Sequence, residues 1–385
     1  MSEIKVNSIK GVAASVAALS INNTDGTCTA NITNNLSNRN IIINGAMQVA
    51  QRGTSFAAPA DGYTLDRWSV YENLSTAQVA VTQETVTDLV GFNKAAKINT
   101  TTAETGVPSA SGNQYVTYIQ PIETTNLLHI GNGTSAAKPL IFSFYVKSNV
   151  TGTFCVSFYK PDNTTRLLSL PYTINSANTW EQKTLLLPAD TTGGGINTDT
   201  GQGLGVYFIL ARKTGYSGTT STSWINYTDS GWAPTCTATI VENVNDHIFI
   251  TGCQLEVDNT ASGKATDFEH RSFAQELALC QRYFYRLAGD DTTIATGHQN
   301  GAYGIFPIRY PQEMRAQPTS TAQTVTDAYS YYYEGSVARV NSVSLQAQNN
   351  RHGNLESTSY NTSNGTVGLF RITNSSAYID ISAEL

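Results

Sequence analysis

Residues 267–289 read DFEHRSFAQELALCQRYFYRLAG and form the one long helix pattern in a sequence that otherwise alternates strand and turn patterns. Its apolar residues recur at intervals of four, three, four and three positions: Phe273, Leu277, Cys280, Phe284 and Leu287. That spacing places them on one stripe of a helix. Ser272 followed by Gln275 matches a capping box, and Gly289 stands where a helix would stop. We therefore predict a helix over residues 272–288.

The apolar stripe of this helix has two interpretations. It packs on a neighbouring β-sheet, or it forms a heptad seam between copies of the chain, because the same spacing serves both purposes. Two heptads are fewer than the roughly three to four that identify a coiled coil by pattern. Spacing alone therefore favours packing on a sheet.

The composition is unusually poor in charge. Charged residues make up 14% of the 385 residues, against about 25% in an average soluble protein. The net charge is −6 and no cluster of Lys and Arg is present, which argues against nucleic acid as a ligand, since phosphate binding needs a basic surface. The five cysteines are widely spaced without a CxxC motif, so we predict neither a disulfide framework nor a zinc site. No apolar run reaches the length of a membrane-spanning helix, so we expect no membrane insertion.

Strand patterns recur from residue 40 onward, rich in Val, Ile, Phe and Tyr and separated by turn residues. Clear examples lie at residues 114–120, 140–147, 153–160, 203–211 and 246–257. Many of them alternate apolar and polar residues, which is typical of antiparallel strands in a sandwich. The runs at 140–147 and 153–160 are joined by a short turn sequence and predict a hairpin.

Four segments stand out as motifs: NIIINGAMQVAQRGTS at 40–55, DGYTLDRWSV at 61–70, FITGCQLEVDNTASGKATD at 249–267 and FEHRSFAQELALCQRYF at 268–284. As a set they resemble a carbohydrate-binding-module-like domain of phage tail fibre and virion appendage proteins. The resemblance implies a jelly-roll-like sandwich in a virion protein that works in adhesion, assembled as a homotrimer. It also favours the helix stripe as a trimer seam, against the preference from spacing.

We predict an all-β chain in three parts. Residues 1–38 form an N-terminal virion-attachment arm. Residues 39–288 form a jelly-roll-like antiparallel β-sandwich closed by one α-helix. Residues 289–385 form a smaller C-terminal β domain that contacts the receptor.

The N-terminal arm is too short and polar to bury a core of its own. Its apolar residues Ile4, Val6 and Ile9 need a surface to cover them. We therefore expect them to attach the chain to other virion proteins, with an unstructured terminus as the other interpretation.

The sequence carries no nucleophile elbow, Walker loop or zinc-ligand spacing. Two close carboxylate pairs, Asp61 with Asp66 and Asp267 with Glu269, flank a turn and the helix entry, where a structural role explains them. We therefore predict a protein that is not an enzyme and that uses no metal or cofactor.

The 20 tyrosines and the many Asn, Thr and Gln side chains suit neutral sugars, whose C–H faces pack on rings and whose hydroxyls need hydrogen-bond partners. Tyr329, Tyr331 and Tyr333 alternate along one predicted strand and so share a face. We predict that this face, with Arg309, contacts host surface polysaccharide. The other interpretation places these tyrosines in a sheet core or a trimer seam.

These patterns together predict a phage tail fibre or receptor-binding protein that is assembled in the host cytoplasm and located on the virion. It would adhere to host glycans through several weak, non-catalytic sites. Two alternatives stay open: a capsid- or neck-decorating virion protein that uses the sandwich as a spacer, and a polysaccharide depolymerase.

Overall fold

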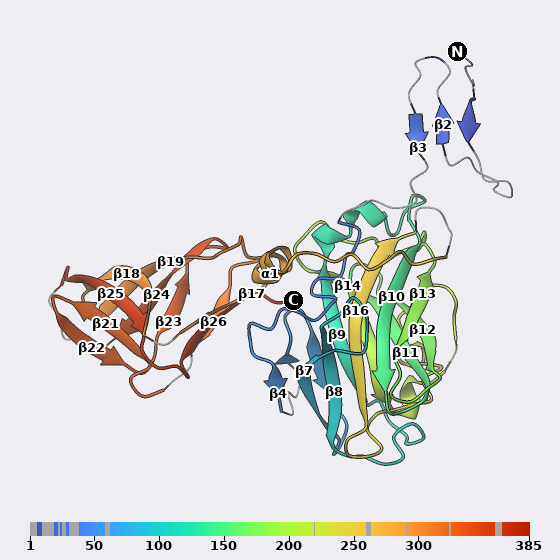
Figure 1. Ribbon diagram of the computed structural model, residues 1–385, viewed down its shortest axis with the longest axis horizontal. Helices are drawn as coiled ribbons and strands as arrows, with labels where there is room; N and C mark the ends of the chain where they lie inside the picture. Colours follow the sequence, from blue (N-terminus) through green and yellow to red (C-terminus); the bar gives the residue numbers. More distant parts are fainter. Residues whose placement is uncertain are drawn as a thin grey trace.

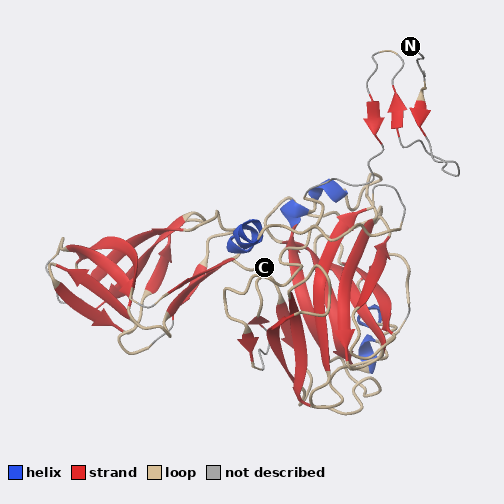
Figure 2. Ribbon diagram, viewed as in Figure 1, coloured by secondary structure: helices blue, strands red, loops and turns tan. Residues whose placement is uncertain are grey.

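The computed structural model describes residues 6–9, 19–21, 24, 28–30, 38–57, 62–218, 220–258, 263–289, 291–322, 325–358 and 364–385. Over these residues the regular secondary structure is almost all antiparallel strand, with one α-helix and short 3-10 turns (Figure 1, Figure 2). A large β-sandwich carries a smaller C-terminal domain on one side and three short N-terminal strands that project from it (Figure 1). The predicted all-β sandwich architecture is confirmed.

Two sheets face each other in the sandwich. The six-stranded sheet has the order β13 (Glu181–Leu187), β10 (Leu140–Ser148), β16 (His247–Val257), β8 (Lys94–Thr102), β7 (Gln78–Thr85) and β4 (Ser55–Phe56). The seven-stranded sheet has the order β15 (Ile225–Asn226), β12 (Arg166–Ile174), β11 (Gly152–Lys160), β14 (Gln202–Arg212), β9 (Tyr115–Glu123), β6 (Ser69–Glu72) and β5 (Gly62–Tyr63). Short 3-10 helices lie in the connections: η1 (Thr124–Asn126), η2 (Leu128–Ile130), η3 (Thr214–Tyr216) and η4 (Asp229–Gly231).

The sandwich core is aromatic. Trp68 stacks on Tyr118 with ring centroids 5.1 Å apart, and Phe142 and Phe144 contact each other in the same core with centroids 5.3 Å apart. All four side chains are fully buried. Successive side chains of a strand point to opposite faces of the sheet. The residues next to these core residues in each strand therefore point away from the core.

The predicted hairpin over residues 140–147 and 153–160 is wrong. β10 belongs to the six-stranded sheet and β11 to the seven-stranded sheet, so residues 149–151 carry the chain from one layer to the other. A short polar turn between two apolar strands looks the same in sequence whether the strands pair or stack.

The helix α1 covers Phe273–Gln281, with the predicted capping box at Ser272 and Gln275, and is shorter than predicted. The residues after it form strand β17 (Phe284–Ala288), which pairs with β26 (Tyr378–Ser382). The aromatic run Tyr-Phe-Tyr favours a strand once a partner is present, and that partner lies far along the sequence. The predicted helix end at residue 288 is therefore wrong.

Most residues of the predicted oligomer seam are buried within the chain. Cys280 is fully buried, Phe284 and Leu287 lie on β17 and are buried within the chain, and Leu277 packs against the cluster around Cys280. Of the five seam residues only Phe273 is exposed, at 55%. A seam that needs all five at the surface is not available, since burial within one chain already uses most of them.

The C-terminal domain starts at β17 rather than at residue 289. One sheet has the order β17, β26 and β20 (Thr319–Ala322). The other has the order β22 (Ser336–Val340), β21 (Tyr329–Tyr333), β25 (Val367–Ile372), β18 (Thr292–Asn300), β19 (Tyr303–Arg309), β24 (His352–Thr358) and β23 (Ser344–Ala347). A second apolar core lies between them.

The two domains meet at a junction of buried ion pairs, beside α1 in Figure 1. Glu384 accepts hydrogen bonds from Arg67 and Arg52 of the sandwich. Arg67 is almost fully buried, lies over the Tyr283 ring at 3.6 Å from its centroid and donates to the Pro121 carbonyl. Such pairs fix the domains in one orientation, because an unpaired buried charge is costly.

A second ion pair strengthens the junction. Arg282 donates two hydrogen bonds to the Glu123 carboxylate, at 2.6 and 2.9 Å, and the Tyr283 hydroxyl donates a third at 2.7 Å. Burial acts to raise the pKa of Glu123, but the hydrogen bonds from Arg282, Tyr283 and Thr125 outweigh it, so its pKa is lowered. Glu123 is therefore ionised at neutral pH.

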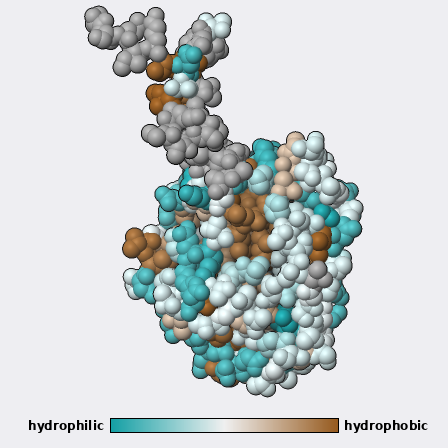
Figure 3. Space-filling view, turned by 90° about the vertical axis from the view of Figure 1, so that its right-hand side faces the viewer, coloured by the Kyte–Doolittle hydropathy of each residue, from teal (hydrophilic) through white to brown (hydrophobic). Residues whose placement is uncertain are grey.

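The N-terminal sheet contains β1 (Ser8–Ile9), β2 (Leu19–Ile21) and β3 (Cys28–Ala30). On the sandwich surface that faces away from the C-terminal domain, hydrophilic and intermediate residues surround a central apolar patch, and smaller apolar spots lie elsewhere on the same face (Figure 3). Among the described residues, no helix has the length and apolar character needed to cross a membrane.

Candidate functional site

The predicted tyrosine face of the C-terminal domain is not a surface. Tyr329 and Tyr331 are fully buried and pack against Phe370 and Phe306 in the core. Tyr333 is half-buried and stacks on Tyr331. The alternation along β21 was predicted correctly, but this face covers the second core. A direct ligand contact by Tyr329 or Tyr331 is therefore excluded.

The other predicted site residues lie apart from one another. Arg309 is exposed at the end of β19, away from the buried tyrosines. In the N-terminal arm, Val6 and Ile9 are exposed at 42% and 52%. Ile4 lies outside the described residues. The attachment role of the arm stays a prediction.

Two of the four carboxylates considered for catalysis, Asp66 and Glu269, hold structural contacts. Asp66 accepts two hydrogen bonds from Gln51, and Glu269 accepts from the backbone N–H groups of Asn38 and Asn40. Asp61 lies outside the described residues.

A groove of about 270 Å³ opens on the outer face of the seven-stranded sheet. Tyr63 on β5 pairs with Ser69 on β6, and Ile119 of β9 pairs with both Ser69 and Tyr207. The four side chains thus form one row across the sheet. Tyr71 lines the same groove, two residues along β6 from Ser69. The residue between them, Val70, points into the core, so Ser69 and Tyr71 both point outward.

A glycine shapes the centre of this groove. A Cβ atom on Gly205 would lie 2.4 Å from Cε2 of Tyr207, so the tyrosine ring lies directly against the glycine backbone. Glycine inside a strand often marks such a close approach. Tyr207 therefore presents a ring along the sheet surface, and the Gln202 amide lies beside its hydroxyl at 3.4 Å.

Neighbouring rings hold the groove tyrosines in place. Tyr71 contacts Tyr115 with centroids 5.1 Å apart, and Tyr207 packs edge-on against the buried Trp232 at 4.9 Å. Such pairs each contribute roughly 0.5–1.5 kcal/mol beyond area burial. The rings are fixed before any ligand arrives, which lowers the entropy cost of binding.

Burial favours the neutral hydroxyl of two groove tyrosines, Tyr207 and Tyr63. It raises the pKa of Tyr207, and it raises the pKa of Tyr63 to about 12. The Tyr63 hydroxyl donates to the Leu385 carbonyl at the edge of the groove. The groove thus offers ring faces, neutral hydroxyls and an amide.

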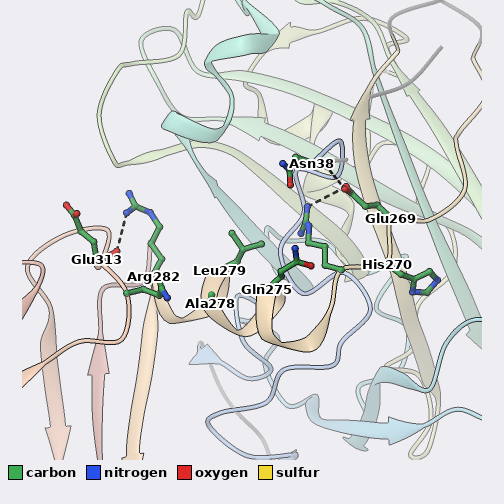
Figure 4. Close-up of a pocket in the computed structure, with 10 residues that line it drawn as sticks. Asn38, Glu269, His270, Gln275, Ala278, Leu279, Arg282 and Glu313 are labelled. Carbon is green, nitrogen blue, oxygen red and sulfur yellow. Dashed lines mark hydrogen bonds and ion pairs between the residues drawn. The ribbon is translucent and has the colours of Figure 1, made fainter. Parts of the chain in front are cut away.

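A larger cavity, of about 630 Å³, lies at the junction of the two domains (Figure 4). Gln275 and Leu279 of α1 project into it, Asn38 and Glu269 lie on the opposite side, and Arg282 approaches Glu313 at its end (Figure 4). Its volume is within the range of small-ligand sites, which often lie between domains.

The charged groups of the junction cavity already have partners in the chain. Glu313 accepts two hydrogen bonds from Arg351, Arg282 is held by Glu123, and Glu269 is held by backbone N–H groups. Its lining has no ring apart from the His270 imidazole. The tyrosine groove is therefore the better candidate for a sugar.

The sequence did not reveal the groove residues. Tyr63, Tyr71 and Tyr207 lie on three strands spread over much of the sandwich, and only strand pairing brings them together. One local signal was present, because isolated glycines within a strand, as at Gly205, indicate a bulge or a close contact.

Comparisons with known proteins give only distant likenesses. No family model and no curated protein matches the chain. Among solved structures, a tailspike protein 4 domain of bacteriophage CBA120 is 13% identical with a TM-score of 0.30, over 57% of this chain and 21% of that one. A family 11 carbohydrate-binding module of Clostridium thermocellum is 12% identical with a TM-score of 0.27, over 53% and 95%. The module TmCBM61, solved with galactotriose, is 10% identical with a TM-score of 0.27, over 57% and 99%. These similarities do not by themselves identify a function.

Proposed function

We propose that this chain is a phage virion adhesion protein, a tail fibre or receptor-binding protein, that binds host surface glycans at the tyrosine groove. The observation that carries the proposal is the row of Tyr63, Ser69, Ile119 and Tyr207, with Tyr71 beside it, on the outer face of the seven-stranded sheet. The rings suit sugar C–H faces, and Ser69 and Gln202 suit sugar hydroxyls.

The groove suits a neutral ligand. None of its lining residues carries a charged side chain, and the Arg52 guanidinium beside the Tyr63 ring is paired with Glu384, which favours an uncharged partner over an ion. The low charge of the whole chain fits the same ligand class.

The groove is proposed to bind without cleaving. Hydrolysis of a glycosidic bond needs two carboxyl groups roughly 5–9.5 Å apart on either side of it. The lining residues include neither Asp nor Glu. The pair of carboxyl groups that hydrolysis needs is therefore missing from the residues that line the groove.

Several copies on one particle would compensate for a weak single site. A shallow groove with two or three rings binds weakly, but joining sites on one particle raises the overall affinity by roughly 10²–10⁴. The predicted homotrimer and the attachment of Ile4, Val6 and Ile9 to other virion proteins belong to this proposal. Immuno-electron microscopy of intact particles checks the location.

Binding of the full chain to an array of bacterial surface polysaccharides and their fragments tests the proposal. We expect Tyr207→Ala and Tyr71→Ala each to weaken retained binding about tenfold, equivalent to about 1.4 kcal/mol. Trp180→Ala, just before β13 and packed against Phe249 of the six-stranded sheet, and Leu279→Trp in the junction cavity are matched controls and should leave binding unchanged. Failure to retain any glycan, or equal binding by all four variants, contradicts the proposal.

A further inference from the structure

Four exposed apolar residues gather on the outer face of the seven-stranded sheet in the C-terminal domain, over strands β22, β21 and β25. Tyr332 on β21 is 40% exposed, Val337 on β22 is 47%, and Leu369 and Val367 on β25 are 38% and 63%. Tyr332 pairs with Val337 on one side and with Leu369 on the other, so the three form a continuous row. We call these four residues the C-terminal apolar face.

The C-terminal apolar face differs from the solvent-facing side of an ordinary antiparallel sheet. The inward residues of the same strands, such as Tyr331 and Phe370, already fill the second core. An antiparallel sheet with one face on a core normally presents polar residues to water on the other. A cluster of large exposed apolar side chains therefore marks an interaction surface.

The rim of the face carries both signs of charge side by side. Arg339 lies 3.9 Å from Asp327, and Arg371 lies 3.0 Å from Asp291. Both acids and Arg339 are more than half exposed, so these pairs contribute little to the single chain. A strongly acidic or basic partner would meet repulsion from half of this rim.

A mixed rim matches another copy of itself. When two such faces meet, the Arg of one copy can lie against the Asp of the other, while the apolar rows cover each other. We propose that the C-terminal apolar face is the surface through which copies of this chain associate. It replaces the α1 seam, whose residues are mostly buried within the chain, and it does not depend on the glycan proposal.

The mass of the full chain in solution, measured by sedimentation velocity and light scattering, tests the proposal. We expect a multiple of the chain mass that dissociates on dilution. Val367→Asp and Val337→Asp should each weaken association at least tenfold, because each inserts a charge into the contact without altering the core. Val90→Asp is the matched control: this sandwich valine is 98% exposed and should leave the mass unchanged.

A charge exchange distinguishes self-association from another partner. Arg339→Glu alone should weaken association, because the introduced carboxylate would face Asp327 of the neighbouring copy, and adding Asp327→Arg should restore it. Circular dichroism confirms that each variant is folded. A monomeric chain at every concentration, an assembly that both valine variants leave intact, or no rescue by the double variant would overturn the proposal.

Discussion

Replacing Glu384 by Gln should destabilise the junction between the two domains. The substitution keeps the shape of the side chain but removes the charge that Arg67 and Arg52 share. Breaking a buried ion pair by removing one partner costs roughly 3–5 kcal/mol. We expect a loss of about 3 kcal/mol, at the lower end of that range. Arg67 keeps the Pro121 carbonyl and the Tyr283 ring, and the new amide oxygen still accepts a hydrogen bond.

Urea unfolding of the full chain, followed by circular dichroism, measures this loss. Glu313→Gln is the matched control, because the ion pair of Glu313 with Arg351 is exposed at 46% and 72%. Such a surface pair contributes about 1 kcal/mol or less. If Glu384→Gln unfolds at the same urea concentration as the unchanged chain, the buried pair does not hold the domains together, and the junction must depend on its apolar contacts.

The groove, the junction and the C-terminal core each give a further prediction. Gly205→Ala should weaken glycan binding about as much as Tyr207→Ala, near tenfold, because the added Cβ displaces the ring; array binding checks it. Because the pKa of Glu123 is lowered in the folded chain, its ionisation stabilises the fold above its unfolded pKa of about 4.3 and this stability is lost as pH falls below that value. Thermal melts of the unchanged chain should therefore fall in acid more steeply than those of Glu123→Gln. Tyr331→Phe removes the hydrogen bond to the Thr366 carbonyl and should cost about 1 kcal/mol in urea unfolding, with glycan binding unchanged.

Local patterns determined much of the fold in advance. The alternation of apolar residues predicted antiparallel strands and a sandwich, because the side-chain period of two follows from the strand backbone itself. The capping box at Ser272 and Gln275 placed the start of α1 correctly, since its hydrogen bonds span only three residues. The alternation of Tyr329, Tyr331 and Tyr333 was likewise read from the chain alone.

Only the tertiary structure decided what those patterns serve. Tyr331 faces a core instead of a ligand because the other sheet of its domain covers that side. The helix ends at Gln281 because β26, almost a hundred residues later, offers a strand partner to the residues that follow. Tyr63, Tyr71 and Tyr207 form a groove only after β5, β6, β9 and β14 align. Periodicity fixes which residues share a face, but contacts between distant segments decide whether that face meets protein or water.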